Sequence, residues 1–378
     1  MRIIGKIFPK FAVIGAGNGG LAFAGYLASQ GYVVNLYNRT VENIKAIIET
    51  REIVLRGAIN ATGTLHVVTN DIKEAIENVD VIMIVVPASA HRIIAKKMAP
   101  YLRDGQIIVL NPGRTGGALE FRNTIREMGI NTRVTVAEVQ TLLYACRKID
   151  ERTINIFSVK NEVSLAALPA TRTRKVINIL AHAFKQFVPA KNVLETSFNN
   201  IGAIFHPAPT LLNSGRIEMN ENFQYYIEGI SPTIARILEE MDRERIEVGR
   251  RLGIDVITTL KWLEQSYGTK ANNLYEAIQE TRAYRGIMAP SRIDNRYIFE
   301  DVPASLVPIS SIGKMLGVPT PTIDAIINLA CAAQDINYWE IGRTVKSLGI
   351  EGKTPKDIRR MVMEEEMSVL EYVEGEVV

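Results

Sequence analysis

His206 is the residue of this chain best suited to proton exchange near neutral pH. It stands before Pro207 at the end of a largely apolar, helix-like run that starts at Asn199. An unperturbed imidazole titrates close to pH 7, so His206 suits general acid–base catalysis. The composition of the run leaves a second interpretation open, a core histidine with a satisfied hydrogen bond. The remaining histidines have no distinctive neighbours in the sequence and are interpreted as bystanders: His66, His91 and His182.

A glycine-rich segment predicts a second kind of chemistry, the binding of a dinucleotide. The predicted strand Phe11–Ile14 runs into Gly15-Ala16-Gly17-Asn18-Gly19-Gly20 and then into a predicted helix, Leu21–Ser29. Gly15 permits a tight turn, Gly17 lets backbone amides approach a pyrophosphate, and Gly20 allows the helix to pack closely on the strand. In this strand–turn–helix context we predict cofactor contacts from Gly15, Gly17, Asn18, Gly19 and Gly20. A purely structural glycine turn is the alternative.

The end of the second predicted strand bears on the choice of cofactor. Sites specific for NAD usually carry an acidic residue there, which binds the ribose 2′-hydroxyl. This chain has Asn38 and Arg39 instead. A guanidinium group is well shaped for a 2′-phosphate, so we predict NADP, with NAD as the alternative. Arg39 stacked on adenine or pointing to solvent is the competing interpretation.

Further strand ends are expected near the nicotinamide. Val85-Val86-Pro87-Ala88 and Leu110-Asn111-Pro112-Gly113 each follow a predicted strand. Open α/β sheets bind ligands at the carboxyl ends of their strands, so Pro87 and Asn111 are candidate cofactor contacts. Ordinary connecting loops remain the alternative for each residue.

The elements that must position these residues change character along the chain. Short β-rich runs alternate with amphipathic stretches up to about Pro189, which predicts a doubly wound α/β Rossmann sheet. The predicted strands are Phe11–Ile14, Val33–Tyr37, Val81–Val86, Gln106–Leu110, Val134–Ala137 and Thr153–Val159, with a hairpin of Glu52–Leu55 and Thr64–Val68. Later helix signals dominate, including Ser231-Pro232 to Gly253 and a helix from Thr320-Pro321. We therefore predict a dinucleotide-binding domain over 1–190, an all-α domain over 191–378, and a cleft between them.

Composition excludes several classes of protein. The 378 residues include 44 Lys and Arg against 41 Asp and Glu, without a long run of one sign, so nucleic acid is an unexpected partner. The apolar run Val81–Val86 is far too short to span a membrane. The first ten residues carry no secretion signal. Cys146 and Cys331 lie in no metal-ligand pattern, so we expect no metal and a cytoplasmic location.

Several motifs together resemble the octopine/opine dehydrogenase family. They are the glycine turn, Asn111-Pro112-Gly113, Tyr144-Ala145-Cys146-Arg147, the segment leading to His206-Pro207, and Arg296-Tyr297-Ile298-Phe299-Glu300-Asp301-Val302-Pro303. The resemblance runs from about Phe11 to Ile350. It implies a Rossmann domain, a helical domain, and NAD(P)H-dependent reductive condensation of an amino acid with a 2-oxo acid. A homodimer is compatible with it.

The resemblance also assigns roles to individual residues. His206 resembles the catalytic histidine of the family and Asp301 the carboxylate that orients it. Arg296 resembles an arginine that holds a substrate carboxylate, and Arg147 is a second, weaker candidate for such a contact. Without the resemblance, Glu300-Asp301 before Val302-Pro303 reads as the start of a turn. Cys146 is left out of the catalytic set, because hydride transfer needs no nucleophile.

Two other functions compete with this prediction. Enzymes of the ketopantoate reductase and glycerol-3-phosphate dehydrogenase type also feed a glycine turn into a Rossmann domain followed by helices. They use a lysine in the first helices after the sheet, whereas Leu194–Pro207 has no lysine and contains His206. A non-catalytic NADP(H)-sensing protein would need the glycine turn without His206, Asp301 and Arg296.

Overall fold

The main sheet is the framework of the first half of the molecule. The computed structural model describes residues 8–364; most of the N-terminal segment tested above for a secretion signal lies outside them. Eight strands form the main sheet in the order β12-β11-β8-β7-β6-β1-β2-β5. They are β1 (Phe11–Ile14), β2 (Val34–Tyr37), β5 (Val67–Thr69), β6 (Val81–Ile84), β7 (Ile107–Leu110), β8 (Thr135–Val139), β11 (Val163–Leu168) and β12 (Phe187–Pro189). The pairs from β5 to β8 are parallel, whereas β11 runs antiparallel to β8.

A second, smaller sheet corrects one expectation. It has the order β4-β3-β10-β9, formed by β3 (Glu52–Gly57), β4 (Ala61–Thr64), β9 (Tyr144–Lys148) and β10 (Thr153–Val159). The prediction that Thr153–Val159 belongs to the parallel main sheet is therefore wrong. Strand periodicity shows that a segment is extended but does not reveal its partner, and β10 pairs with β9 and β3. The predicted hairpin is only partly correct: β3 contains Glu52–Leu55, but its partner β4 shares only Thr64 with the predicted strand Thr64–Val68, and Val67 and Val68 belong to β5 of the main sheet.

The inner strands of the main sheet are buried on both faces, as their apolar sequences require, whereas the edge strands β5 and β12 are partly exposed. In β6, Val81 and Met83 belong to one hydrophobic core, and Ile82 and Ile84 belong to the other. Successive side chains of a strand point to opposite faces, so this alternation places one core on each side of the sheet. Helices accompany the sheet: α1 (Asn18–Ser29), α2 (Lys45–Thr50), α3 (Ile72–Ile76), α4 (His91–Met98), α5 (Gly117–Glu127) and α6 (Thr173–Leu180). The doubly wound fold is confirmed.

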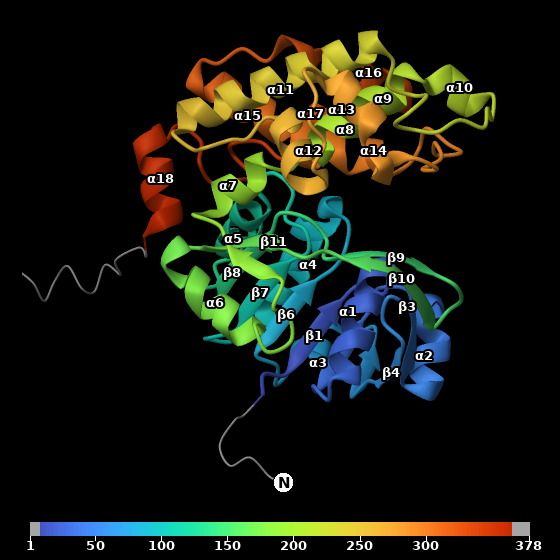
Figure 1. Ribbon diagram of the computed structural model, residues 1–378. Helices are drawn as coiled ribbons and strands as arrows, with labels where there is room; N and C mark the ends of the chain where they lie inside the picture. The colour runs from blue at the N-terminus through green and yellow to red at the C-terminus, as the bar shows by residue number, and fades with distance from the viewer. Residues whose placement is uncertain (1–7, 365–378) are drawn as a thin grey trace, which may run out of the picture.

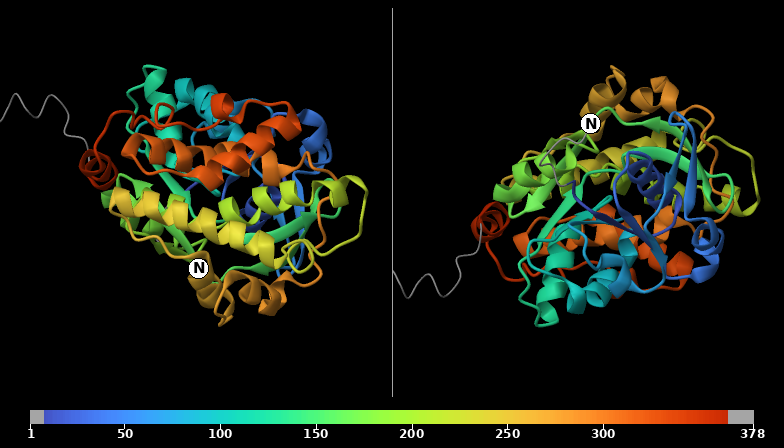
Figure 2. Two further views of the ribbon diagram at one scale, coloured as in Figure 1. Left: turned by 90° about the horizontal axis from the view of Figure 1, so that it is seen from above. Right: turned by 90° about the horizontal axis from the view of Figure 1, so that it is seen from below.

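The second half is helical and stacks against the first (Figure 1). Its helices are α7 (Val193–Phe198), α8 (Gly202–Phe205), α9 (Pro207–Leu212), α10 (Ser214–Glu218), α11 (Pro232–Leu252), α12 (Thr259–Tyr267), α13 (Leu274–Glu280), α14 (Arg296–Phe299), α15 (Val307–Leu316), α16 (Pro321–Gln334), α17 (Tyr338–Ile341) and α18 (Pro355–Met363). The long helix α11 crosses this half, as Figure 2 shows from above. The Ser231 hydroxyl accepts a hydrogen bond from the Ile234 N–H, and Gly253 ends the helix with a φ of +75°. Both ends agree with the prediction.

The two halves share one core, and the chain returns to the sheet half after the helices. The core that contains Ile84 also contains Phe198 and Val307 of the helical half. The last helix of the described chain, α18, contacts both α11 and the turn 170–172 of the sheet half. No single position in the chain therefore divides the contacts of one half from those of the other. The domain boundary between residues 190 and 191 stays a prediction.

Candidate active site

His206 and Asp301 meet at the centre of the candidate site. The Nδ1 atom of His206 lies 2.7 Å from Oδ2 of Asp301, although 95 positions separate the two residues. His206 stands between α8 and α9, and Asp301 precedes the helical turn Val302–Leu306. Asp301 has no solvent-exposed surface. The hydrogen bond expected between them is present, and Glu300-Asp301 also begins a helical turn, so the two interpretations of this segment are compatible.

Arg114 compensates the buried charge of Asp301. Its Nη1 atom lies 3.0 Å from Oδ1 of Asp301, and its Nε donates to Oε1 of Glu300 at 3.3 Å. Burial alone would raise the pKa of Asp301, but the charges of Arg114 and His206 outweigh it and hold this pKa below its ordinary value. Asp301 is therefore a carboxylate at neutral pH. As such it can orient the imidazole and stabilise its protonated form.

The imidazole of His206 is fixed on a second side by an aromatic ring. Tyr297 stacks on it with ring centroids 4.2 Å apart and an interplanar angle of 16°. The backbone carbonyl of His206 also accepts a hydrogen bond from the Tyr225 hydroxyl at 2.7 Å. Because Nδ1 is engaged with Asp301, Nε2 is the ring nitrogen left for a substrate. Within residues 8–364, no group hydrogen-bonds to it.

The two arginines predicted to bind substrate lie near Tyr297. Arg296 begins α14, is largely exposed, and places Nε 3.6 Å from Oε2 of Glu300. Arg147 lies on β9 of the small sheet and is exposed. Burial raises the pKa of the Tyr297 hydroxyl, and the charges of Arg296 and Arg147 both act against that increase. The structure thus brings both arginines into electrostatic range of the ring that holds His206, one from each half of the molecule.

The glycine turn has the shape that a pyrophosphate requires. Gly15 adopts a φ of +112°, and a Cβ at Gly20 would lie 1.7 Å from the Gly15 carbonyl oxygen, so close packing of strand and helix needs both glycines. A Cβ at Gly17 would meet nothing within 4 Å, and no side chain caps the first turn of α1. The free N–H groups of a helix N-terminus next to open space fit an anionic pyrophosphate. At Gly19, a Cβ would press against Leu142 at 3.1 Å.

Three polar residues near the glycine turn differ in whether their side chains are hydrogen-bonded within the protein. The Asn38 side chain accepts from the Ala16 N–H at 3.1 Å and donates to the Thr40 carbonyl, so it holds the turn in place. Asn18 similarly accepts from the backbone N–H of Lys148. The exposed Arg39 side chain has no hydrogen bond or ion pair with any residue from 8 to 364. Asn38 and Arg39 were predicted to bind a 2′-phosphate, and of these two only Arg39 has a side chain without a hydrogen-bond partner among residues 8–364.

The strand ends after β6 and β7 approach the His206–Asp301 pair. Pro87 is exposed, and the backbone N–H of the next residue, Ala88, donates to Oε1 of Glu300 at 3.2 Å. Asn111 is buried and donates from Nδ2 to the Val109 carbonyl at 2.7 Å. The chain continues from Asn111 to Arg114, which binds Asp301. The carboxyl edge of the sheet therefore forms one side of the site.

Sequence reasoning missed residues that complete this arrangement. Arg114 pairs with Asp301, and Tyr297 stacks on His206. A signal existed for each: Arg114 directly follows the motif Asn111-Pro112-Gly113, and Tyr297 lies inside the motif that begins at Arg296. Neither signal identifies a partner, because the contacts join distant segments.

Arg343 and His91 form a second buried contact at the junction of the halves. Arg343 is buried at the junction of the halves, where Nε donates to Glu120 at 2.7 Å and Nη1 to the Gly113 carbonyl at 2.9 Å. Its Nη2 lies 3.0 Å from Nδ1 of His91. Burial, then the charges of Arg343 and Arg114, hold the pKa of His91 well below its ordinary value. His91 is thus a neutral, buried partner of Arg343, and its interpretation as a bystander in catalysis stays a prediction.

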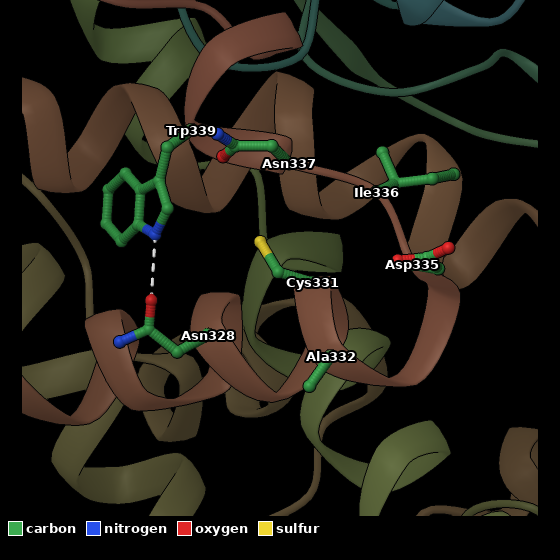
Figure 3. Close-up of a pocket in the computed structure, with 7 residues that line it drawn as sticks. All are labelled: Asn328, Cys331, Ala332, Asp335, Ile336, Asn337 and Trp339. Carbon is green, nitrogen blue, oxygen red and sulfur yellow. Dashed lines mark hydrogen bonds between the residues drawn. The ribbon is translucent and has the colours of Figure 1, made fainter.

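A surface hollow between α16 and α17 is lined by Asn328, Cys331, Ala332, Asp335, Ile336, Asn337 and Trp339 (Figure 3), none of which was predicted to act in catalysis or binding. Among residues 8–364, no cluster of His, Cys, Asp and Glu could hold a metal ion. Over the same residues, every helix is too short or too polar to cross a membrane.

Fold and site together define a dehydrogenase that joins a Rossmann-like sheet half to a helical half. Residues 189–334 match the α-helical domain of the NAD/NADP octopine/nopaline dehydrogenases, and residues 10–125 match the N-terminus of NAD-dependent glycerol-3-phosphate dehydrogenase. The chain is 41% identical over 354 residues to an opine dehydrogenase of Arthrobacter sp. (strain 1C), which covers 93% of this chain and 98% of the relative. The chain belongs to the opine dehydrogenase family and is an NAD(P)-dependent oxidoreductase acting on CH–NH donors.

Solved structures agree with this assignment at the level of the fold. Octopine dehydrogenase, in a structure with NADH and L-arginine, superimposes with a TM-score of 0.77 at 22% identity and covers 95% of this chain and 100% of its own. Yersinopine dehydrogenase with NADP⁺ bound gives a TM-score of 0.74 at 15% identity and covers 94% and 98%. The match to glycerol-3-phosphate dehydrogenase reaches residue 125 and so concerns the sheet half alone.

Proposed function

We propose that this protein condenses an amino acid with a 2-oxo acid and reduces the resulting imine, with His206 as the group that moves protons. The supporting observation is the geometry of His206: Asp301 binds Nδ1 at 2.7 Å, Tyr297 stacks on the ring, and Nε2 has no partner among the described residues. A bound nicotinamide cofactor supplies the hydride for the reduction. Arg39 supports a preference for NADPH over NADH.

The proton balance of this reaction needs one group that works in both directions. An amino acid enters as an ammonium ion, which must lose a proton before its nitrogen can attack the carbonyl carbon of the 2-oxo acid. The hydroxyl group formed by that attack must then gain a proton and leave as water, which creates the imine. His206 accepts the first proton and donates the second, and the complete reaction consumes one further proton from solvent. The buried carboxylate of Asp301 stabilises the imidazolium that exists between these steps.

Arg296 and Arg147 supply positive charge for the substrates. A product with a secondary amine between two carboxylates carries two negative groups, and guanidinium groups bind carboxylates through paired hydrogen bonds. The two arginines come from different halves of the molecule. We assign Arg296 to a substrate carboxylate and regard Arg147 as a candidate for another.

The direct test is product identification. The protein is incubated with NADPH, a mixture of amino acids and a mixture of 2-oxo acids, and any secondary amine is identified by mass spectrometry. We expect secondary-amine products that disappear when either substrate is omitted or when His206 is replaced by alanine. A 2-hydroxy acid formed from the 2-oxo acid alone would instead favour a ketopantoate reductase type of activity. Binding of NADPH without consumption of it would favour a sensor.

A further inference from the structure

Arg343 holds the loop that carries Arg114. It follows α17 in the helical half, beyond the residues that match the octopine/nopaline dehydrogenase domain, and its side chain is 3% exposed. Its Nη1 atom donates to the Gly113 carbonyl at 2.9 Å and to the Thr115 carbonyl at 3.0 Å. These two residues flank Arg114, the partner of Asp301. One guanidinium group of the helical half thus fixes the backbone on both sides of Arg114.

The backbone of Arg114 needs this support. Its φ is +60°, in the left-handed region that residues with a Cβ avoid. Such conformations persist at functional sites where the surrounding contacts hold them. Besides its bond to Arg343, Thr115 donates from its N–H to the Ala304 carbonyl at 3.1 Å, within the helical turn that follows Asp301. These contacts therefore stabilise the backbone conformation that presents Arg114 to Asp301.

The same guanidinium group holds the loop after β6. Its Nη2 atom donates to the Ala88 carbonyl at 3.3 Å and to Nδ1 of His91 at 3.0 Å. The Ala88 N–H in turn donates to Oε1 of Glu300 at 3.2 Å. Glu300 directly precedes Asp301 in the chain. The loops after β6 and β7 are therefore both held by Arg343, and both reach this pair of carboxylates.

The side chain of Arg343 has no donor left for a substrate. Its Nε donates to Oε2 of Glu120 at 2.7 Å, and Glu120 is itself buried. A guanidinium group carries five N–H donors, and this one has five acceptors within 3.3 Å, with the Ala304 carbonyl farther away at 3.5 Å. Glu120 also compensates its charge. Arg343 can therefore act on the reaction only through the residues that it holds.

We propose that Arg343 is a positioning residue for hydride transfer, because it sets the placement of the loops after β6 and β7 relative to the His206–Asp301 pair. This inference rests on the proposed function, since these loops are the ones expected to flank the nicotinamide. The hydride donor, the imine and the imidazole must be aligned, and a displacement of about 1 Å can lower a rate about 10²-fold. A lysine at this position keeps the charge but has three donors on a flexible stem, so it cannot replace the planar group.

The test compares Arg343→Lys with the wild type and with Arg245→Lys. Arg245 is the matched control, because it is a buried arginine of α11 that pairs with the carboxylate of Asp242. Its hydrogen-bond partners within residues 8–364 lie outside the loops after β6 and β7. The measurements are Tm, NADPH affinity by fluorescence titration, and the rate of NADPH oxidation in a single turnover.

The two variants should differ in rate although both lose stability. In Arg343→Lys we expect hydride transfer to be about 10- to 100-fold slower, with a larger primary isotope effect when the transferred hydrogen of NADPH is deuterium. NADPH affinity should change little, because the glycine turn is untouched. Arg245→Lys should lower Tm and keep the rate and the isotope effect of the wild type.

A spectroscopic measurement separates this inference from the proposed function. The proton between Nδ1 of His206 and Oδ2 of Asp301, which are 2.7 Å apart, should give an NMR resonance far downfield of the amides that is absent in His206→Ala. We expect this resonance to shift in Arg343→Lys, because the contact of Arg114 with the carboxylate changes, and to stay in place in Arg245→Lys. The measurement needs neither substrate nor cofactor.

The outcomes are distinguishable. If the wild type forms no secondary amine but the resonance shifts in Arg343→Lys alone, the proposed function fails and the positioning of the pair stands. If Arg343→Lys lowers Tm but retains the rate and the resonance, Arg343 only stabilises the junction and the inference is overturned. The inference is also overturned if Arg245→Lys loses as much rate for the same loss of Tm.

A milder variant serves if Arg343→Lys does not fold. Glu120→Gln removes the counter-charge of Arg343 but keeps an oxygen that can accept from Nε. We expect hydride transfer to slow in the same direction by a smaller factor, together with a smaller shift of the resonance. An unchanged rate and resonance in Glu120→Gln would then overturn the inference.

Discussion

The contact between His206 and Asp301 makes a quantitative prediction about their joint replacement. In His206→Ala the proton donor is lost, and we expect kcat to fall about 10²- to 10⁴-fold, the usual contribution of general acid–base catalysis. That loss corresponds to about 2.7 to 5.4 kcal/mol in activation free energy. In Asp301→Asn, an amide can donate to Nδ1 where the carboxylate accepts at 2.7 Å, so it favours the wrong tautomer and kcat also falls.

The double variant distinguishes a catalytic pair from two independent residues. Asp301 acts on the reaction through His206. Adding Asp301→Asn to the His206→Ala variant should therefore lower kcat by less than about 10-fold further. Independent effects would multiply instead. Asp301→Asn should also lower the free energy of unfolding by about 3 kcal/mol, near the lower end for breaking a buried ion pair, since Arg114 keeps Glu300 at 3.3 Å.

The assay follows NADPH consumption at saturating substrates, with cofactor affinity measured separately by fluorescence titration. Affinity for NADPH should change little in all three variants, because the glycine turn is untouched. Asp294→Asn, at an exposed carboxylate in the same segment, is the matched control and should resemble the wild type. Multiplying losses in the double variant, or an unchanged rate in His206→Ala, would refute the reasoning.

Three further predictions concern single charges. Arg39→Ala should weaken NADPH binding about 10- to 100-fold and leave NADH binding unchanged in fluorescence titrations, because the exposed guanidinium would contact only the 2′-phosphate; equal losses would remove Arg39 from that role. Arg296→Lys should raise the KM of one substrate although the charge is kept, because an ammonium group cannot form paired hydrogen bonds with a carboxylate; near-normal constants would make it a surface residue. Asp301 stabilises the fold where it is ionised, because its folded pKa lies below the ordinary value, so this stability is lost as the pH falls below about 4. Urea unfolding should therefore show the advantage of wild type over Asp301→Asn shrinking between pH 6 and about pH 3, whereas parallel curves would contradict it.

Much of the fold could be predicted because its signals are local. The glycine turn, the strand before it and the helix after it form one continuous segment, so residue type and spacing are sufficient to identify them. The N-cap Ser231 and the terminal Gly253 mark the ends of α11 for the same reason. The pairing of β10 with β9 and β3 could not be predicted, because strand periodicity contains no information about the neighbouring strand.

The candidate site likewise combines features with local signals in the sequence and contacts between distant segments. The nucleotide-binding turn could be recognised from local residue types and spacing, and the motif around Asp301 carried the resemblance to the opine dehydrogenase family. That Arg114 compensates Asp301 and that Tyr297 stacks on His206 can be seen only in the folded molecule. Compensation of a buried charge depends on which side chains the folded core excludes from water together, and residues from distant segments carry no mark of that in their local sequence.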